Sequence, residues 1–511
     1  MKSKDPTCIG RVRHVLGAAV TVALDADVAG VTPIYRGEIH RVGQIGSLVR
    51  IPQGVVDLIA TVELVGISEL SGPLQPAQVV QQDQRWLQVQ LLGEVDRGTG
   101  SFQRGVGSYP GLDDPVHFAT PAQLTAIFPR ADSEHLRLGR LAAADNVPLC
   151  VDASRFVVRH AAVVGSTGSG KTSAVASLLQ GFARGGWNAA NIVVIDPHGE
   201  YRKALAETAC VKSVLAPGES GLRVPFWALS APEILQGFRV TASAPFSERY
   251  SELVTEARRE FVAQSTWLDL DESAITADTP VPFDIREVWH RLDCENNETL
   301  EDGSPSVLDA GHAATLRSTR YKPYGPGNTP PNKGPRYGWY GTSPDQLRRG
   351  LRDPQLRFFR GPEGTLHGDD PLVRIVQDWL GGDSPVSVLD FSGVPNVAAD
   401  LAVGLVLSLI FEVAVRTGTD TKGIGRPRPV LVVLEEAHRF LGSGASSLTR
   451  NSANRIAREG RKYGVGLLLV TQRPSELPDT ALAQCGTILA LRLSNSEDQG
   501  TIRAALPDMW S

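Results

Sequence analysis

The amino-acid sequence predicts an α/β protein with a mostly parallel sheet, a small N-terminal β-barrel and a helical insertion inside the sheet domain. From residue 160 onwards, six apolar strand-like runs recur, and helix-like segments separate most of them, which is typical of βαβ units. Between residues 8 and 92, shorter β-rich runs alternate with turns, a spacing that indicates a small all-β barrel or sandwich.

The predicted domain borders follow from where these runs fall. The β-rich runs are AAVTVALD, GEIHRVG, GSLVRIP, ATVELVGI and RWLQVQLLGEV, and the later apolar runs are AAVVG, NIVVIDP, VSVLDF, PVLVVLEE, GVGLLLVTQ and GTILALRL. About 190 residues separate NIVVIDP from VSVLDF, and the gap holds two helix-like stretches, APFSERYSELVTEARREFVAQSTWLDL and PFDIREVWHRL. We therefore expect a barrel and linker over 1–145, a first core segment over 146–211, a helical insertion over 212–384 and a second core segment over 385–511.

The composition of the chain argues against a generally basic or membrane-embedded protein. Hydrophobic residues make up 42% and charged residues 21% of the 511 positions, as in soluble globular proteins. The formal net charge is −5, so a nucleic-acid contact would need a local basic stripe or a lined channel. The longest apolar stretch, residues 401–411, falls short of the roughly 20 residues of a membrane helix. We expect a buried core helix there and no membrane partner.

The cysteines and the first residues predict a cytoplasmic location. The five cysteines are scattered along the chain without a CxxC pair, which favours a reducing compartment and argues against a structural zinc site. The first ten residues, MKSKDPTCIG, lack the apolar core of a secretory signal.

The strongest motif is a glycine-rich loop between a strand-like and a helix-like run. Residues 165–172, GSTGSGKT, match the pattern G-x-x-x-x-G-K-[ST] at every position. In such a loop, backbone N–H groups surround the phosphates of a nucleotide, Lys171 can reach the β- and γ-phosphates, and the Thr172 hydroxyl can hold Mg²⁺. The predicted nucleotide-binding residues are Gly165, Ser166, Thr167, Gly168, Ser169, Gly170, Lys171, Thr172 and Ser173.

Two glutamates end the run PVLVVLEE, where a purely structural buried strand would avoid charge. In nucleotide hydrolases, the first carboxylate of such a pair assists Mg²⁺, usually through water, and the second polarises the attacking water. Glu435 and Glu436 are therefore predicted catalytic residues, with Glu435 also near the metal.

Polar residues also end two other predicted strands. Asp196 ends NIVVIDP at a sheet edge where open α/β proteins bind ligands, although a turn former ahead of Pro197 would look similar. Thr471 and Gln472 end GVGLLLVTQ, where a polar side chain can sense the γ-phosphate or orient water. An ordinary strand-ending turn is the alternative for this pair.

Arginines recur on the helix predicted before GVGLLLVTQ. Arg455, Arg458 and Arg461 are three residues apart and share one helix face. A solvated basic face is the ordinary interpretation, but in a ring of subunits these arginines could reach a neighbour's nucleotide or line a channel. Arg159, just before the strand of the glycine loop, is a second candidate of this kind.

The segment 320–341, RYKPYGPGNTPPNKGPRYGWYG, interleaves aromatic and basic residues with proline and glycine. This mixture suits a nucleic-acid loop. A surface connection is the alternative, and it is the interpretation we favour.

Taken together, RHAAVVGSTGSGKT, VVIDPHGEY, VLDFSGVP, VVLEEAHRFL, AREGRKYGVGLLLVTQRPSELP and LRLSNSEDQGTIRAAL resemble the HerA family of ring ATPases, relatives of the FtsK DNA pumps. The resemblance covers nearly the whole chain. It implies a RecA-like P-loop ATPase core, a barrel of the kind that precedes this core in the family, and a hexamer that threads double-stranded DNA through its channel. ATP and Mg²⁺ are the cofactors that it implies.

The resemblance also implies roles for single residues and for partners. Lys171 and Thr172 correspond to nucleotide and metal binding, Glu436 to the catalytic glutamate, Asp196 to an additional acid, Gln472 to a sensor, and Arg159 and Arg461, with Arg458 close behind, to inter-subunit arginines. Relatives work with an effector, a nuclease or a sirtuin-like enzyme, in DNA-end processing or antiphage defence, and the barrel is the implied docking surface. Relatives also continue with a strand and an arm beyond the point where LPDMWS stands here.

Three functions stay open at this stage. The first is a DNA-translocating motor driven by ATP hydrolysis. The second is a regulatory scaffold that hydrolyses ATP to assemble or switch a bound effector, with DNA pumping secondary. The third, a small-molecule P-loop kinase, is disfavoured because the double glutamate and TQR suit attack by water better than transfer to a metabolite.

Overall fold

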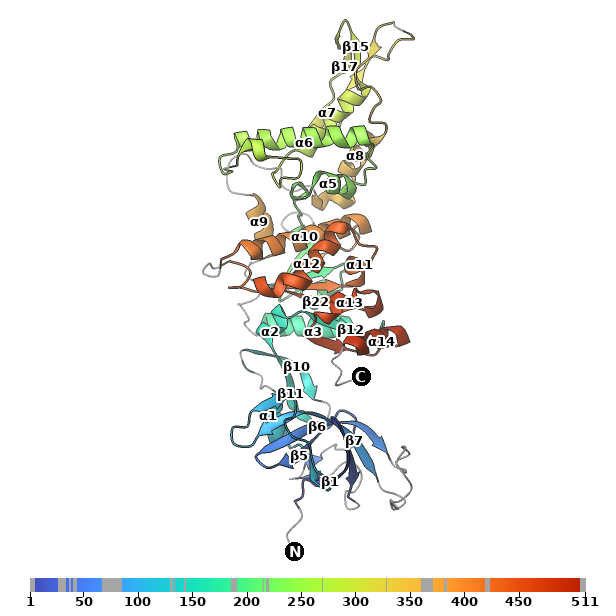
Figure 1. The fold of residues 1–511 in the computed structure, drawn as a ribbon. Helices are drawn as coiled ribbons and strands as arrows, with labels where there is room; N and C mark the ends of the chain where they lie inside the picture. Colours follow the sequence, from blue (N-terminus) through green and yellow to red (C-terminus); the bar gives the residue numbers. More distant parts are fainter. Residues whose placement is uncertain are drawn as a thin grey trace. The chain divides into compact units, whose positions relative to one another are not determined.

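The computed structural model in Figure 1 divides into two compact units, with the border between Ser154 and Arg155. The predicted borders after residues 145, 211 and 384 stay predictions. The structure describes residues 5–25, 34–35, 38–39, 44–66, 85–128, 132, 134–141, 144–184, 191–214, 216, 220–268, 270–327, 329–359, 371–380, 384–418 and 423–505.

The first unit is built on a closed antiparallel barrel. Its strands pair in the order β2-β1-β9-β5-β6-β7, and pairing of β2 with β7 closes the ring, with β8 added beside β7. Alternate residues of β7 are buried inside the barrel, as a period of two requires. The bounds are β1 (Cys8–Leu16), β2 (Ala19–Leu24), β5 (Leu48–Gln53), β6 (Val56–Gly66), β7 (Trp86–Asp96), β8 (Phe102–Arg104) and β9 (Pro115–Phe118).

The predicted barrel is therefore confirmed, with one run outside it. Four of the five β-rich runs coincide with β2, β5, β6 and β7. Of the run GEIHRVG the structure describes only Glu38–Ile39 (β4), which pairs with β3 (Ile34–Tyr35) in a separate two-stranded sheet. The first and last barrel strands, β1 and β9, were not predicted.

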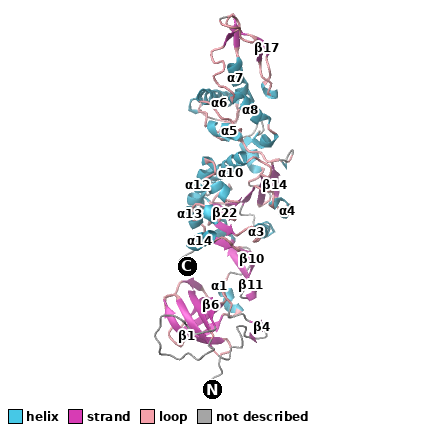
Figure 2. Cartoon of the chain, turned by 90° about the vertical axis from the view of Figure 1, so that its right-hand side faces the viewer, coloured by secondary structure: helices cyan, strands magenta, loops and turns pink. Residues whose placement is uncertain are grey.

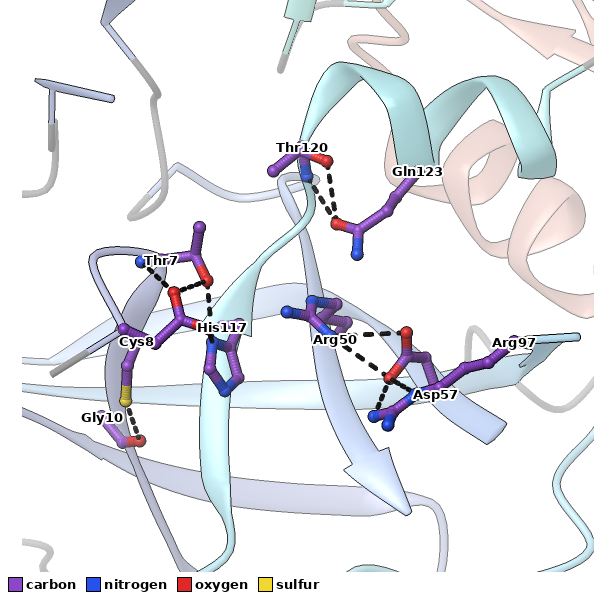
Figure 3. Close-up of polar contacts among 10 residues, drawn as sticks. Thr7, Cys8, Gly10, Arg50, Asp57, Arg97, His117, Thr120 and Gln123 are labelled. Atoms are coloured by element: carbon purple, nitrogen blue, oxygen red, sulfur yellow. Dashed lines mark hydrogen bonds and ion pairs between the residues drawn. The ribbon is translucent and has the colours of Figure 1, made fainter. Parts of the chain in front are cut away.

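Charged side chains of the barrel are paired with one another (Figure 3). Asp57 of β6 is buried and accepts hydrogen bonds from Arg50 of β5 at 3.3 Å and from Arg97, after β7, at 2.6 Å. His117 of β9 lies 2.9 Å from the hydroxyl of Thr7, and burial lowers the pKa of this imidazole. The contacts of Asp57 with Arg97 and of Thr7 with His117 join segments of the barrel that are distant in sequence.

In the sequence, the barrel strands are followed by α1 (Pro121–Ile127), the hairpin of β10 (His135–Leu141) and β11 (Ala144–Asp152), and α2 (Ala153–Val158). Figure 2 shows that strands dominate the first unit, whereas helices and strands alternate in the second.

The second unit contains a seven-stranded parallel sheet in the order β14-β20-β13-β21-β22-β12-β23. Six of these strands are the predicted apolar runs, which confirms the predicted fold class, and the edge strand β14 was not predicted. Strand β22 lies between the strand of the glycine loop and the strand of the two glutamates. The bounds are β12 (Ala161–Val164), β13 (Asn191–Asp196), β14 (Cys210–Ser213), β20 (Val386–Asp390), β21 (Val430–Glu435), β22 (Val465–Thr471) and β23 (Thr487–Ala490).

Every residue of β13, β21 and β22 is buried, as expected for strands covered on both faces. Gly466 of β22 lies directly beneath the carbonyl oxygen of Val157 in α2, where a side chain would find no room. The glycine therefore permits a close approach of this helix to the strand.

The helices of the sheet domain include the predicted core helix. Residues 401–411 lie in α10, which packs against α12, side by side in Figure 1. Among the described residues, α10 alone is long and apolar enough to cross a membrane, and 67% of its most apolar window is buried inside the protein. The bounds are α3 (Lys171–Arg184), α4 (Tyr201–Ala204), α9 (Pro371–Gln377), α10 (Asn396–Arg416), α11 (His438–Leu441), α12 (Ser447–Tyr463), α13 (Asp479–Ala483) and α14 (Ser496–Ala505).

The segment between β14 and β20 forms the helical insertion. Its two longest helices, α6 and α7, confirm the helix-like stretches predicted there. Besides α9, the α-helices of this segment are α5 (Ala231–Gly237), α6 (Ala244–Gln264), α7 (Ile285–Asn297) and α8 (Ser343–Arg352), and its short strands are β15 (Thr299–Glu301), β16 (Ser304–Pro305), β17 (Val307–Asp309), β18 (Arg320–Tyr321) and β19 (Asn332–Lys333).

The aromatic and basic residues of the segment 320–341 contact each other. The Lys333 ammonium lies 4.4 Å from the ring centroid of Tyr324 and 5.2 Å from that of Tyr337. Trp339 is 61% exposed. Cation–π contacts therefore give this surface segment a defined conformation, while a role in nucleic-acid binding stays a hypothesis.

Candidate active site

The glycine loop joins the end of β12 to the start of α3. Gly168 and Gly170 have φ of 75° and 95°, a region that suits glycine. A Cβ at Gly165 would lie 2.5 Å from the Ser169 hydroxyl oxygen, so this position also needs glycine. The Lys171 ammonium is mostly buried and donates to the carbonyl oxygen of Gly165 at 2.8 Å. The loop thus has bare backbone at a helix N-terminus, with a lysine amine held beside it.

Side chains from neighbouring segments contact the loop. Thr167 donates its hydroxyl hydrogen to Gln472 Oε1 at 2.6 Å, so the predicted sensor at the end of β22 lies against the loop. The hydroxyl oxygens of Ser166 and Ser494 are 2.9 Å apart, and Ser166 Oγ also accepts the backbone N–H of Ser494 at 2.9 Å. The segment after β23 therefore lies on the other side of the loop.

Glu435 is buried at the end of β21 and hydrogen-bonded to a tyrosine. Only 3% of its surface is exposed, and Oε2 accepts the hydroxyl of the fully buried Tyr201 at 2.5 Å. Burial raises the pKa of Glu435 to about 7, and the charge of Glu436 acts in the same direction. Because Tyr201 already donates a hydrogen bond to Oε2, the role of Glu435 near a metal stays a prediction.

Glu436 has a backbone conformation that non-glycine residues rarely adopt. Its φ is 52°, in the left-handed region, and such strain of about 1–3 kcal/mol persists mostly at functional sites. Its Oε2 is buried without a hydrogen bond among the described residues and lies 3.3 Å from His438 Nδ1. Burial lowers the pKa of His438, while the charge of Glu436 opposes this shift. Glu436 therefore has an unsatisfied carboxylate oxygen at the site.

Asp196 uses both carboxylate oxygens to cap the turn before α4. Its Oδ1 accepts the backbone N–H groups of His198, Gly199 and Glu200, at 2.8–3.2 Å, and Oδ2 accepts that of Tyr201 at 2.9 Å. Burial raises the pKa of Asp196, and the four hydrogen bonds oppose this shift. These contacts match the turn-forming alternative, and the role as an additional catalytic acid stays a prediction.

A carboxylate that the sequence analysis missed is Glu200. Its Oε2 accepts the hydroxyl of Thr172, the predicted metal-binding threonine, at 2.7 Å. The signal lies in DPHGEY, where this acid follows the capped turn directly. The turn around Asp196 thus presents Glu200 to the glycine loop and Tyr201 to Glu435.

The predicted arginines separate into two groups. Arg455 donates to Glu412 of α10 at 2.7 Å and lies 4.5 Å from the ring centroid of Phe411. Its side chain therefore binds α10 of the same chain. Arg458, Arg461 and Arg159 are exposed, and no hydrogen bond or ion pair of their side chains is found among the described residues. The structure therefore does not bring these three arginines to the glycine loop of their own chain.

A glycine loop, an acidic strand end and a polar strand end, gathered at one edge of a parallel sheet, define a P-loop nucleotide-binding protein. The chain matches the family model "Helicase HerA, central domain" over residues 136–410 and the model "Helicase HerA-like C-terminal" over residues 373–510. The protein therefore belongs to the HerA helicase family.

Relatives are similar over most of the chain. The DNA double-strand break repair helicase HerA of Pyrococcus furiosus is 26% identical over 400 residues, which cover 73% of this chain and 63% of the relative. The probable helicase MJECL08 of Methanocaldococcus jannaschii is 24% identical over 438 residues, covering 85% and 75%. The chain thus spans somewhat less than two thirds of the Pyrococcus relative. Among solved structures, VirB4 of Thermoanaerobacter pseudethanolicus aligns with a TM-score of 0.45 at 15% identity, covering 74% of this chain and 90% of that one.

Proposed function

We propose that the protein is an ATP-hydrolysing motor that assembles as a hexameric ring and moves double-stranded DNA through it. The observation that carries this proposal is the strained Glu436, with its unsatisfied carboxylate oxygen, at the same sheet edge as a complete phosphate-binding loop. Family membership supports the choice of DNA, because curated relatives are named as DNA repair helicases.

Magnesium fits the oxygen donors at the starts of α3 and α4. The Thr172 hydroxyl gives its hydrogen to Glu200, which leaves oxygen lone pairs for a hard cation, and carboxylate oxygens are preferred ligands of Mg²⁺. Thr172 and Glu200 would hold the ion, which neutralises charge on the β- and γ-phosphates when bound. Glu435 stays a proposed contributor to the water shell of the metal.

The remaining groups have separate roles in hydrolysis. Lys171 binds the β- and γ-phosphates beside the N–H groups of the loop. Glu436 takes the proton of the attacking water, and Gln472, already in contact with Thr167, orients that water or the γ-phosphate.

The ring explains the exposed arginines. Arg159, Arg458 and Arg461 are exposed to solvent and form no ion pair with the described part of the chain, as expected of side chains that act on a neighbour's nucleotide. Mixing Arg461→Ala with Lys171→Ala subunits should restore part of the ATP turnover that each lacks alone, because mixed rings contain intact composite sites. Turnover that stays absent at every mixing ratio would remove Arg461 from this role.

The barrel offers a docking surface for an effector such as a nuclease or a sirtuin-like enzyme, in DNA-end processing or antiphage defence. Large apolar side chains are exposed at a strand end and in two turns: Leu16 by 72%, Val55 by 76% and Leu112 by 70%. This feature favours the second candidate function, a cytoplasmic scaffold that switches an effector by ATP hydrolysis.

The experiment that separates the two functions measures ATP turnover of the purified chain with and without linear double-stranded DNA, together with its mass in solution. A hexamer whose turnover rises several-fold with DNA supports the motor. A hexamer that ignores DNA supports the scaffold, and a monomer without turnover contradicts both.

A further inference from the structure

Three side-chain contacts and one step along the backbone connect the glycine loop to Glu436. Thr167 contacts Gln472 at 2.6 Å, and Gln472 directly follows Thr471 at the end of β22. Thr471 Oγ1 lies 3.1 Å from His438 Nδ1, and the same nitrogen lies 3.3 Å from Glu436 Oε2. The route thus crosses from the loop to β22 and then to the turn after β21.

The hydrogen-bonding capacity of these groups makes His438 the shared member. Thr471 is fully buried, and its Oγ1 already accepts the backbone N–H of Arg473 at 3.0 Å. One imidazole nitrogen faces both Thr471 and Glu436, and it can make one strong hydrogen bond at a time. Glu436 Oε2 is buried without a hydrogen bond among the described residues, and His438 Nδ1 lies 3.3 Å away, so this imidazole is placed either to bind that oxygen or to leave it free.

We propose that His438 is a positioning residue for Glu436, which it links through Thr471 and Gln472 to the nucleotide loop. This inference rests on the proposed function, since it takes Glu436 as the base of hydrolysis. When His438 donates to Glu436, the carboxylate is held away from water. When contacts at Thr167 shift Gln472 and Thr471, the imidazole bonds Thr471 instead and Glu436 becomes available.

The test uses variants that change one contact each in the full chain. His438→Ala removes the link, and His438→Asn keeps a short polar group at the position of Nδ1. Thr471→Val removes the hydroxyl with little change of shape, and Thr471→Ser keeps it. Arg439→Ala is the matched control, because Arg439 lies on the same short helix and bonds Asn396 instead. For each variant, kcat and KM of ATP turnover and the affinity for a fluorescent ATP analogue are measured.

We expect Thr471→Val to lower kcat by about tenfold, the effect of one hydrogen bond to a charged group, because the imidazole then stays on Glu436. His438→Ala should raise kcat, because Glu436 is no longer held, and nucleotide affinity should stay unchanged within about twofold in both variants. His438→Asn and Thr471→Ser should each return kcat toward that of the unmodified chain. The double variant should have the kcat of His438→Ala alone, because Thr471 acts on Glu436 only through His438.

Three results would overturn the link: an unchanged kcat in His438→Ala, effects that multiply in the double variant, or an equal change of kcat in Arg439→Ala. If His438→Ala or Thr471→Val fails to fold, the kcat of His438→Asn or Thr471→Ser, compared with that of the unmodified chain, tests the link instead. Failure of the proposed function is distinguishable from failure of this inference. If Glu436 is not the base, Glu436→Gln keeps full turnover. If only the role of His438 is wrong, Glu436→Gln is inactive and His438→Ala has normal turnover.

Discussion

The barrel and the edge of the parallel sheet differ in whether their buried carboxylates are paired with arginines. In the barrel, Asp57 is matched by the guanidinium groups of Arg50 and Arg97. At the sheet edge, Glu435 has a raised pKa, and one carboxylate oxygen of Glu436 has no hydrogen bond within the part of the chain that the structure describes. The buried carboxylate of the barrel thus has its charge balanced by arginines, whereas the carboxylates at the sheet edge lack such balance, as is common where groups act on a ligand.

The sharpest way to break this comparison is Glu436→Gln. Removing the charge of the proposed base should lower ATP turnover by about a thousandfold, within the range of general base catalysis, with nucleotide affinity nearly unchanged. Turnover and binding of a fluorescent ATP analogue are measured beside Glu260→Gln, an exposed glutamate of the insertion. Appreciable turnover in Glu436→Gln would contradict the assigned role.

For the barrel, Asp57→Asn should act on stability alone. The buried Asp57 loses its charge, and two guanidinium groups lose their partner, which costs about 2 kcal/mol. Denaturant unfolding should show an earlier transition, with nucleotide affinity unchanged. Asp113→Asn is the control, because the pair of Asp113 with Arg13 is largely exposed and should contribute at most about 0.5 kcal/mol. Equal losses in both variants would contradict the comparison.

Glu200→Gln sharpens the assignment of the metal site. The amide loses the charge beside Thr172, so the gain in ATP affinity produced by Mg²⁺ should fall about tenfold, the typical effect of removing a supporting metal ligand. Affinity in EDTA should stay the same. Binding is titrated with and without Mg²⁺, beside Glu207→Gln, an exposed glutamate after α4. An unchanged response to Mg²⁺ would leave Glu435 as the candidate acid.

The smallest expected effect separates two arginines of α12. Arg455→Ala should lower the free energy of unfolding by about 0.5–1 kcal/mol, because it loses its pair with Glu412 and the face of Phe411. Arg458→Ala should leave stability unchanged and act on turnover instead. Denaturant unfolding of both variants checks this, and a reversed order would place Arg458 within the chain's own packing.

The sequence predicted the parallel sheet because fully buried strands are continuous apolar runs. It missed β1, where Arg11, Arg13 and His14 interrupt the apolar residues, and β14, whose sequence is CVKS. Short edge strands, and strands with one face exposed to solvent, have a weaker hydrophobic sequence pattern than strands that are buried on both faces.

At the site, the sequence predicted residues that sit in a motif or at a strand end. Glu200 and His438 were missed because their partners, Thr172 and Thr471, are 28 and 33 residues away. Asp196 was predicted from its strand end alone, where the pattern does not reveal that four backbone N–H groups occupy its carboxylate.

The close approach of Val157 to Gly466 has a consequence for the alignment of β22. All seven residues of this strand are buried, so sliding it by one position would exchange one apolar contact for another at little cost. The same shift would move the side chain of each of Thr471 and Gln472 to the other face of the sheet, so that Thr471 would lose His438 and Gln472 would lose the glycine loop. Because only Gly466 fits beneath the Val157 carbonyl, and Leu467 would collide there, this glycine fixes the register on which the active site depends.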